Sequence, residues 1–414
     1  MYQKTILPSG LRVVTVPMPQ VKSVTALVMV AAGSRYESQR INGLSHFLEH
    51  MIFKGTKRRP SSLAISSLID GIGGQFNAFT SKEYTGFYVK AESRHLNLIL
   101  DVLSDMLLNS LYDPKELDKE RGVIIEEINM YEDQPQARVS ELFEELLYGK
   151  QPLAWRISGE KKNIREITHK DMTDYVRKMY HSKAMVIGLA GNIENNNINK
   201  YFGNIFSGEE NKYLPVAEKQ TKSKSLIYYK KTDQAHLCLG VRAYDLNHPD
   251  RYALAVLGTI LGGNMSSRLF IEVREKRGLA YYVHADSEEF HDCGYFVTQA
   301  GLRLADISDA IKVILNEFNK MKNNLVPEKE LRRAKDHARG RMVLGLEDSY
   351  RTASFYASQE LLRKEIETPE EVLAKIEAVT AEDIQRVAKD IFVNQKLNLA
   401  IVGPFKKAWK ELSF

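Results

Sequence analysis

Two parts of the chain repeat each other at one constant separation. Gly86-Phe87-Tyr88-Val89 recurs as Gly294-Tyr295-Phe296-Val297, 208 residues further on, and each stretch precedes a segment with helical apolar spacing. Asp101 in the first segment and Asp309 in the second keep the same separation of 208 residues. A separation that is constant across a strand, a loop and a helix indicates an internal duplication. The chain is therefore expected to fold as two similar halves.

A polar segment near the middle of the 414 residues separates these halves. Residues 207–222 are weakly periodic and contain Pro215, as is typical of a linker. We predict an N-terminal half over residues 1–206, a linker over 207–222 and a C-terminal half over 223–414. Strand-like and helix-like patterns alternate in both halves. They predict an α+β fold in which each half is a mostly antiparallel β-sheet with helices packed on it.

Composition narrows the class of protein. Hydrophobic residues make up 43% and charged residues 27%, which are globular values. The longest apolar run, from Val24 to Gly33, is about half a membrane span and predicts a buried strand. The net charge is only +5 and the basic stretches are short, so neither a membrane nor a nucleic-acid partner is expected. Two cysteines and the lack of an apolar leader favour a cytoplasmic location.

The segment His46-Phe47-Leu48-Glu49-His50 is the sharpest chemical signal. In a helix, His46 and His50 lie one turn apart on one face, and Glu49 borders that face. Two imidazoles in this arrangement can bind one Zn²⁺, and the carboxylate beside them can accept a proton from water. The alternative is a surface helix that carries two histidines by chance.

A catalytic zinc needs a third protein ligand, and the helix expected over residues 114–130 carries acids within an apolar segment. Glu120 and Glu127 are seven residues apart, which places them two turns apart on one face. Glu126 lies about 100° away around the helix and is the better candidate for a solvated acid. Because unpaired buried carboxylates are costly, two acids on an apolar stripe favour a shared role.

A second metal site is conceivable in the C-terminal half. His236 and Cys238, and likewise His291 and Cys293, are spaced so that both members of a pair face one side of a strand. Structural zinc sites usually show two to four residues between cysteines, and buried cysteines on strands are common. The residues therefore favour packing over a Cys₂His₂ site.

The order H-x-x-E-H is the inverzincin signature, and the chain resembles the pitrilysin and mitochondrial processing peptidase family along nearly its whole length. In that family a glutamate about 75–77 residues after the second histidine completes a zinc site. Glu127 follows His50 by 77 residues and Glu126 follows it by 76. The resemblance implies that Glu127 is the third ligand, with Glu126 as the other candidate. It also implies that Glu120 orders the ligands and affects water activation.

The same resemblance implies substrate-binding residues. Asn77, Ala78 and Phe79 match the family's substrate-binding edge strand. Arg274 and Tyr281 match its R-x₆-Y element, in which the tyrosine donates a hydrogen bond to the oxyanion and the arginine positions substrate or supports that charge. From the residues alone, Tyr281 would be interpreted as a core aromatic.

The second half is expected to bind no metal. At the separation of 208 residues, positions 46, 49 and 50 correspond to Leu254, Leu257 and Gly258. One Zn²⁺ per chain follows. The function expected from the resemblance is a zinc-dependent endopeptidase that hydrolyses peptides or unfolded protein segments inside an enclosed chamber.

In the resembled family four such halves enclose the chamber, so this chain is expected to form a homodimer, or a heterodimer with a metal-free homologue. Two alternatives remain: a presequence-processing subunit acting with a homologous partner, and a non-catalytic structural subunit. Members that prefer arginine near the cut use acids just after the glutamate helix. The matching residues 136–141 keep only Glu141, which favours a general peptidase.

Overall fold

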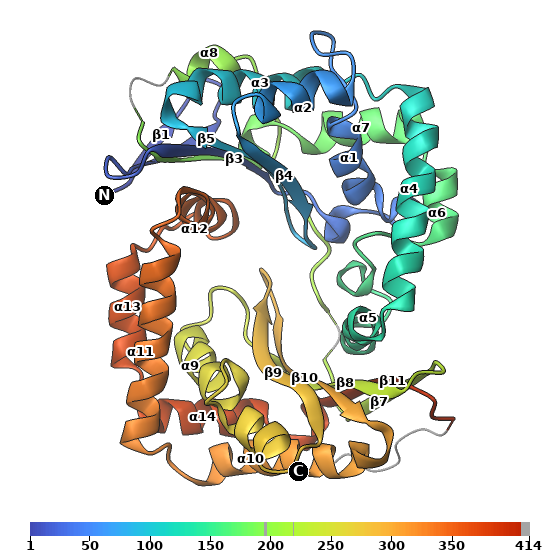
Figure 1. Ribbon diagram of the computed structural model, residues 1–414, viewed down its shortest axis with the longest axis vertical. Coiled ribbons are helices and arrows are strands. Elements are labelled where there is room, and N and C mark those ends of the chain that lie inside the picture. The colour runs from blue at the N-terminus through green and yellow to red at the C-terminus, as the bar shows by residue number, and fades with distance from the viewer. Residues whose placement is uncertain (194–196, 218, 407–414) are drawn as a thin grey trace. The chain divides into compact units, whose positions relative to one another are not determined.

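The computed structural model describes residues 1–193, 197–217 and 219–406, and the chain divides into two compact units (Figure 1). The first unit comprises Met1–Asn129, Trp155–Leu214 and Val343–Ile366. The second unit comprises Met130–Ala154, Pro215–Met342 and Glu367–Phe414.

Each unit is built on one β-sheet. The first sheet has six strands in the order β1-β2-β6-β3-β5-β4, and the second has five in the order β7-β11-β8-β10-β9. The strands of the first sheet are β1 (Gln3–Ile6), β2 (Arg12–Pro17), β3 (Ser23–Val30), β4 (Gln75–Thr80), β5 (Thr85–Glu92) and β6 (Met185–Gly191). Those of the second are β7 (Lys224–Tyr229), β8 (Gln234–Ala243), β9 (Ala280–Glu289), β10 (Gly294–Arg303) and β11 (Leu397–Gly403).

The two sheets repeat one topology. The series β2-β6-β3-β5-β4 matches β7-β11-β8-β10-β9, and β1 is an addition at one edge. In both series the first pair is parallel and every later pair is antiparallel. This repetition confirms the predicted α+β fold with two duplicated halves, each a mostly antiparallel sheet with helices packed on it.

Helices cover the sheets of both units. The helices of the first unit are α1 (Leu44–Ile52), α2 (Ser62–Asp70), α3 (Leu96–Asn109), most of α4 (Pro114–Asp133), α6 (Lys161–Glu166), α7 (His169–Met179), α8 (Ile198–Phe202) and α12 (Ser349–Leu362). Those of the second are α5 (Pro135–Tyr148), α9 (Arg251–Gly262), α10 (Ile307–Asn323), most of α11 (Glu328–Gly345), α13 (Pro369–Ala378) and α14 (Ala381–Ile391). A π-helical segment, η6, spans Phe270–Glu275.

Each unit also takes one helix from the other half of the sequence. Helix α12 contacts β3, β6 and β2, whereas α5 contacts β11, β8 and β7. The compact units therefore differ from a division into 1–206 and 223–414, although one crossing between units, at Leu214–Pro215, lies within the predicted linker. The physical reason is that both sheets have a second apolar face, and a helix far away in the sequence covers it.

The central strand β3 illustrates this packing. Val24 and Val28 point into the core beneath α1 and α3, whereas Leu27 and Met29 pack in a second cluster with residues of α12. A strand that is buried on both faces has a continuous apolar sequence without alternation. This explains the apolar run that begins at Val24. Among the described residues, no helix is both long and apolar enough to cross a bilayer.

Candidate metal site

Helix α1 carries the H-x-x-E-H segment. A carboxylate from the segment just before the helix accepts hydrogen bonds from its first residues. The helix follows Gly43, whose φ of 99° lies in the left-handed region that favours glycine. Glu37 accepts hydrogen bonds from the backbone N–H groups of Gly43, at 2.8 Å, and Ser45, at 2.6 Å. It also accepts one from Nδ2 of Asn42 at 3.0 Å. The buried Glu37 therefore caps α1 and interacts favourably with the helix dipole.

Burial raises the pKa of Glu37, and its hydrogen bonds from Ser45, Gly43 and Asn42 offset only part of that increase. Sequence analysis missed this residue, because Glu37 lies outside the three-residue spacing of a capping box.

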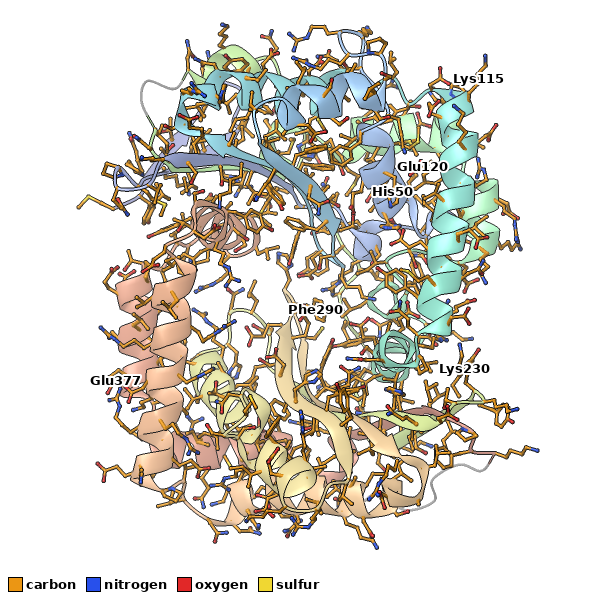
Figure 2. All side chains as sticks on the ribbon, in the orientation of Figure 1. His50, Lys115, Glu120, Lys230, Phe290 and Glu377 are labelled. Carbon is orange, nitrogen blue, oxygen red and sulfur yellow. The ribbon has the colours of Figure 1, made fainter. Side chains whose placement is uncertain are left out.

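Three side chains from α1 and α4 converge on one point. Nε2 of His46 and Nε2 of His50 are 3.3 Å apart, and Oε2 of Glu127 lies 3.5 Å from each of them. Figure 2 shows His50 on α1 facing α4, with Glu120 beside it. Among the described residues, these three form the one group of His, Cys, Asp or Glu whose possible ligand atoms all lie within 4.8 Å of one another. The structure thus brings together the ligand set expected from the sequence.

Glu126, the other candidate, lies outside this group. It is exposed, and its Oε2 accepts a hydrogen bond from Nδ2 of Asn129 at 3.2 Å. The rotation of about 100° per residue carries it away from the face that holds Glu127.

The three donors fit a zinc ion. Nitrogen and oxygen ligands lie about 2.0–2.1 Å from a tetrahedral zinc, which places them about 3.3–3.4 Å from one another. The observed separations of 3.3 and 3.5 Å match this spacing. Three protein ligands leave a fourth position open, as in catalytic rather than structural sites. Two neutral imidazoles and one carboxylate suit zinc better than they suit calcium or magnesium, which prefer oxygen ligands.

A second carboxylate supports one of the imidazoles. Oε1 of Glu120 lies 2.8 Å from Nδ1 of His50, and Oε2 of Glu120 lies 2.5 Å from Nζ of Lys54. This contact directs Nε2 of His50 toward Glu127 and is the usual outer support of a metal-binding histidine. Nδ1 of His46, in contrast, is buried without a hydrogen-bond partner among the described residues. Sequence analysis missed Lys54, for which the available signal was its position four residues after His50.

These contacts shift the pKa values of the site. Burial lowers the pKa of His50, but hydrogen bonds and charges from Glu120 and Glu127 outweigh it and raise the value to about 9. Hydrogen bonds to His46 and His50 hold the pKa of Glu127 well below its usual range. Burial raises the pKa of Glu120, yet its bonds to His50 and Lys54 reverse this and lower it. The acids are therefore ionised at neutral pH, and metal binding would release a proton from His50.

Glu49 lies half-buried beside this cluster. Its Oε2 accepts a hydrogen bond of 2.5 Å from the hydroxyl of Thr80, the last residue of β4. Strand β4 is the edge of the first sheet next to β5, and α1 contacts it. Of the expected substrate residues on β4, Asn77 is exposed, Phe79 is half-buried and Ala78 is buried. The expected base and the expected substrate strand therefore meet in the first unit.

Arg274 and Tyr281 belong to the second unit, and their part in the site stays a prediction. Arg274 lies in the π-helical segment η6, and its guanidinium carbon is 5.7 Å from the centre of the Tyr281 ring and 4.8 Å from that of Phe270. Tyr281 is 75% exposed, so it is not the core aromatic that its sequence neighbours suggest. π-helical segments occur frequently at functional sites.

The histidine and cysteine pairs of the second unit form no metal cluster among the described residues. Nδ1 of His236 lies 3.0 Å from the hydroxyl of Tyr282, and Cys238 is buried with Sγ 3.9 Å from Oγ of Ser140. Both contacts are hydrogen bonds within the second unit.

Comparison with known proteins identifies the family of the chain. Residues 12–161 match the family model described as insulinase, peptidase family M16, and residues 166–337 match the peptidase M16 inactive domain. The chain is 37% identical to a Streptomyces coelicolor protein named as an uncharacterized zinc protease, over 98% of this chain and 90% of that protein. It is 36% identical to YmxG of Bacillus subtilis, which carries the same description, over 98% of both chains. The crystal structure of a protease from Helicobacter pylori superimposes with a TM-score of 0.91 at 22% identity, covering 98% of this chain and 99% of that one.

Proposed function

Because the chain belongs to peptidase family M16, and because His46, His50 and Glu127 converge on one point, we propose that it is a zinc-dependent endopeptidase. It would hydrolyse peptides or unfolded protein segments. The observation that carries this proposal is the triangle of donor atoms with sides of 3.3 and 3.5 Å, beside which Glu49 lies.

The residues of the first unit have distinct parts in this proposal. His46, His50 and Glu127 hold one zinc ion, and Glu120 keeps His50 oriented. Zinc bound there would lower the pKa of a water molecule from about 15.7 toward 7 and polarise a peptide carbonyl. Glu49 accepts the proton of the attacking water at its carboxylate and returns it to the leaving amine.

Substrate positioning is proposed for two regions. An extended peptide adds to the edge of β4 at Asn77, Ala78 and Phe79, because an edge strand offers unpaired N–H and C=O groups. Tyr281 donates a hydrogen bond to the developing oxyanion, and Arg274 supports that charge. The exposed ring of Tyr281 and its contact with Arg274 support this assignment.

The decisive test replaces Glu49 by Gln. We expect the variant to bind zinc as the wild type does and to lose hydrolysis of a quenched peptide by at least about 100-fold. Glu126→Gln is the matched control, since Glu126 is an exposed glutamate that lies outside the donor group. Wild-type turnover by the Glu49 variant would contradict its role as base. A zinc-loaded wild type that cleaves no peptide would favour the non-catalytic structural subunit instead.

General peptide hydrolysis is favoured over arginine-directed presequence processing. Glu141, the acid that remains in residues 136–141, accepts a hydrogen bond of 2.8 Å from Nη1 of Arg138. Its charge is therefore already compensated within the chain. Cleavage-site mapping on a peptide library by mass spectrometry distinguishes the two specificities, because presequence processing would enrich arginine near the cut.

We also propose that the chain works as a pair, as a homodimer or with a metal-free homologue. The family's use of four halves around a chamber supports this, since one chain supplies two. Light scattering at working concentration should give twice the chain mass of 47.2 kDa for a homodimer. A fully active monomer would contradict both forms of the pair.

A further inference from the structure

The carboxylate of Glu49 accepts a hydrogen bond from Thr80, a residue without an assigned role in the site. Thr80 Oγ1 donates to Oε2 of Glu49 at 2.5 Å, which is at the short end of the range for O–H···O hydrogen bonds. The contact joins the helix that carries the metal ligands to the last residue of the edge strand β4.

The backbone around Thr80 fixes the position of that hydroxyl. Thr80 pairs with Thr85 across the β4–β5 ladder, and the hydroxyl of Thr85 donates to the carbonyl of Ala32 at 2.7 Å. In the turn between them, the N–H of Ser81 donates to the carbonyl of Tyr84 at 2.8 Å. Thr80, whose hydroxyl donates to Glu49, is therefore fixed by its strand pairing with Thr85 and by the hydrogen bond across the turn that follows it.

A second chain segment clamps the same hairpin from outside. The N–H of Arg35 donates to the carbonyl of Lys82 at 2.9 Å, and the Arg35 side chain forms a buried ion pair with Glu83. Gly33 permits this close approach, because a Cβ at that position would lie 2.4 Å from the carbonyl oxygen of Ser81. The hairpin that presents Thr80 is thus held against residues 33–35 by a backbone hydrogen bond, an ion pair and close packing.

From this geometry we infer that Thr80 is a positioning residue for Glu49. Its hydrogen bond occupies Oε2 and leaves Oε1 available for water. Because the terminal torsion of a glutamate is broad, one fixed hydrogen bond sets the orientation of the carboxylate plane and thus the direction in which its other oxygen points. Thr80 also belongs to β4, so the strand that would dock the peptide orients the base directly. This inference rests on the proposed peptidase function.

The test compares Thr80→Val with Thr80→Ser. Valine keeps the size and β-branching of threonine but removes the hydroxyl, whereas serine keeps the hydroxyl. For the valine variant we expect kcat on a quenched peptide to fall about 10- to 100-fold while KM stays within about twofold. The serine variant should recover kcat to within about threefold of the wild type. Zinc content and the thermal unfolding midpoint should be unchanged in both variants.

Several outcomes would overturn the inference. They are a wild-type kcat in the valine variant, a loss that serine does not restore, and a change confined to KM. If valine prevents folding, Thr80→Ala replaces it, and a crystal structure of the zinc-loaded variant should show Glu49 rotated away from its wild-type position. Failure of the proposed function itself is recognised separately, since the wild type would then be inactive or Glu49→Gln would be active.

Discussion

Helices α1 and α9 occupy corresponding places in the two units, yet they differ in chemistry at corresponding positions. Each contacts the edge strand of its sheet, α1 on β4 and α9 on β9. The positions of His46 and Glu49 in α1 correspond to Leu254 and Leu257 in α9, and both leucines are fully buried. Helix α9 also packs tightly, since a Cβ on Gly262 would lie 2.2 Å from the backbone nitrogen of Ala285.

The comparison shows that the duplicated fold does not itself require a polar site. The same strand order accommodates either an apolar contact or a cluster of imidazoles and carboxylates, depending on a few side chains. The chemistry is therefore determined by those side chains and not by the fold, since one fold can occur with or without a given site.

Replacing His46 by Leu, the residue of the second unit, should have the largest effect. The variant places an apolar side chain in a buried position and removes one of the three proposed metal ligands. We expect bound zinc to fall from about one ion per chain to none and hydrolysis to fall at least about 1,000-fold. Metal analysis after dialysis and a quenched-peptide assay measure both. His169→Leu, at the exposed start of α7, is the control. Zinc retained by the His46 variant would refute the ligand assignment.

Substitutions of the neighbouring residues Glu127 and Glu126 on α4 should also differ strongly in their effect on zinc affinity. Glu127→Gln should weaken zinc binding by at least about 100-fold in chelator competition, because a neutral amide replaces the anionic ligand. Glu126→Gln should leave zinc affinity within about twofold, since its carboxylate contacts Asn129 and solvent. The reverse order of effects would show that Glu126 is the ligand.

The starts of α1 and α9 offer a comparison of stability. Glu37 is buried and accepts three hydrogen bonds at the start of α1, whereas Asp250 before α9 pairs at the surface with Arg386. Glu37→Gln should lower the free energy of unfolding by about 1–3 kcal/mol, because an amide group cannot accept at both positions. Asp250→Asn should cost less than about 1 kcal/mol. Denaturant unfolding followed by circular dichroism measures both, and equal effects would contradict the capping role of Glu37.

The sequence predicted the duplicated fold and indicated the candidate ligand set, because a repeated segment and a helical spacing are both visible as sequence patterns. Gly86 and Gly294, which are 208 residues apart, lie at the starts of β5 and β10, and the four-residue spacing of His46 and His50 is a property of one helix. The resemblance implied Glu127 as the third ligand with Glu126 as the other candidate, and the structure places only Glu127 beside the two histidines.

Other features could not be read from the sequence, because they join residues that are distant along the chain. The hydrogen bond from Thr80 to Glu49 spans 31 residues and depends on how β4 meets α1. The exchange of α5 and α12 between the units depends on which apolar sheet face is left uncovered. Neither has a local signal, since any amphipathic helix could cover either face.

The smallest predicted difference is in the free energy of unfolding, between variants of Asp101 and of Asp309. These two residues are part of the repeat that indicated the duplication. Asp101 pairs with Arg58 at 2.9 Å and with Arg59, and 29% of its side chain is exposed. Asp309 pairs only with the exposed Lys312 among the described residues, at 3.3 Å, and 70% of its side chain is exposed. Burial raises the pKa of Asp101, but the hydrogen bonds from Arg59 and Arg58 outweigh it and lower the value.

A carboxyl whose pKa is lower in the folded state stabilises the fold above its unfolded pKa of about 3.9 and loses this effect as pH falls through the folded value. Asp101→Asn should therefore lower the free energy of unfolding by about 1 kcal/mol at pH 7, and the difference from the wild type should shrink in the range below about pH 4. Asp309→Asn should change it by less than about 0.5 kcal/mol at any pH. Denaturant unfolding at pH 7 and pH 3 measures both. If the two variants behave alike, the duplicated aspartates were preserved by the helix pattern and not by the ion pairs that one of them forms.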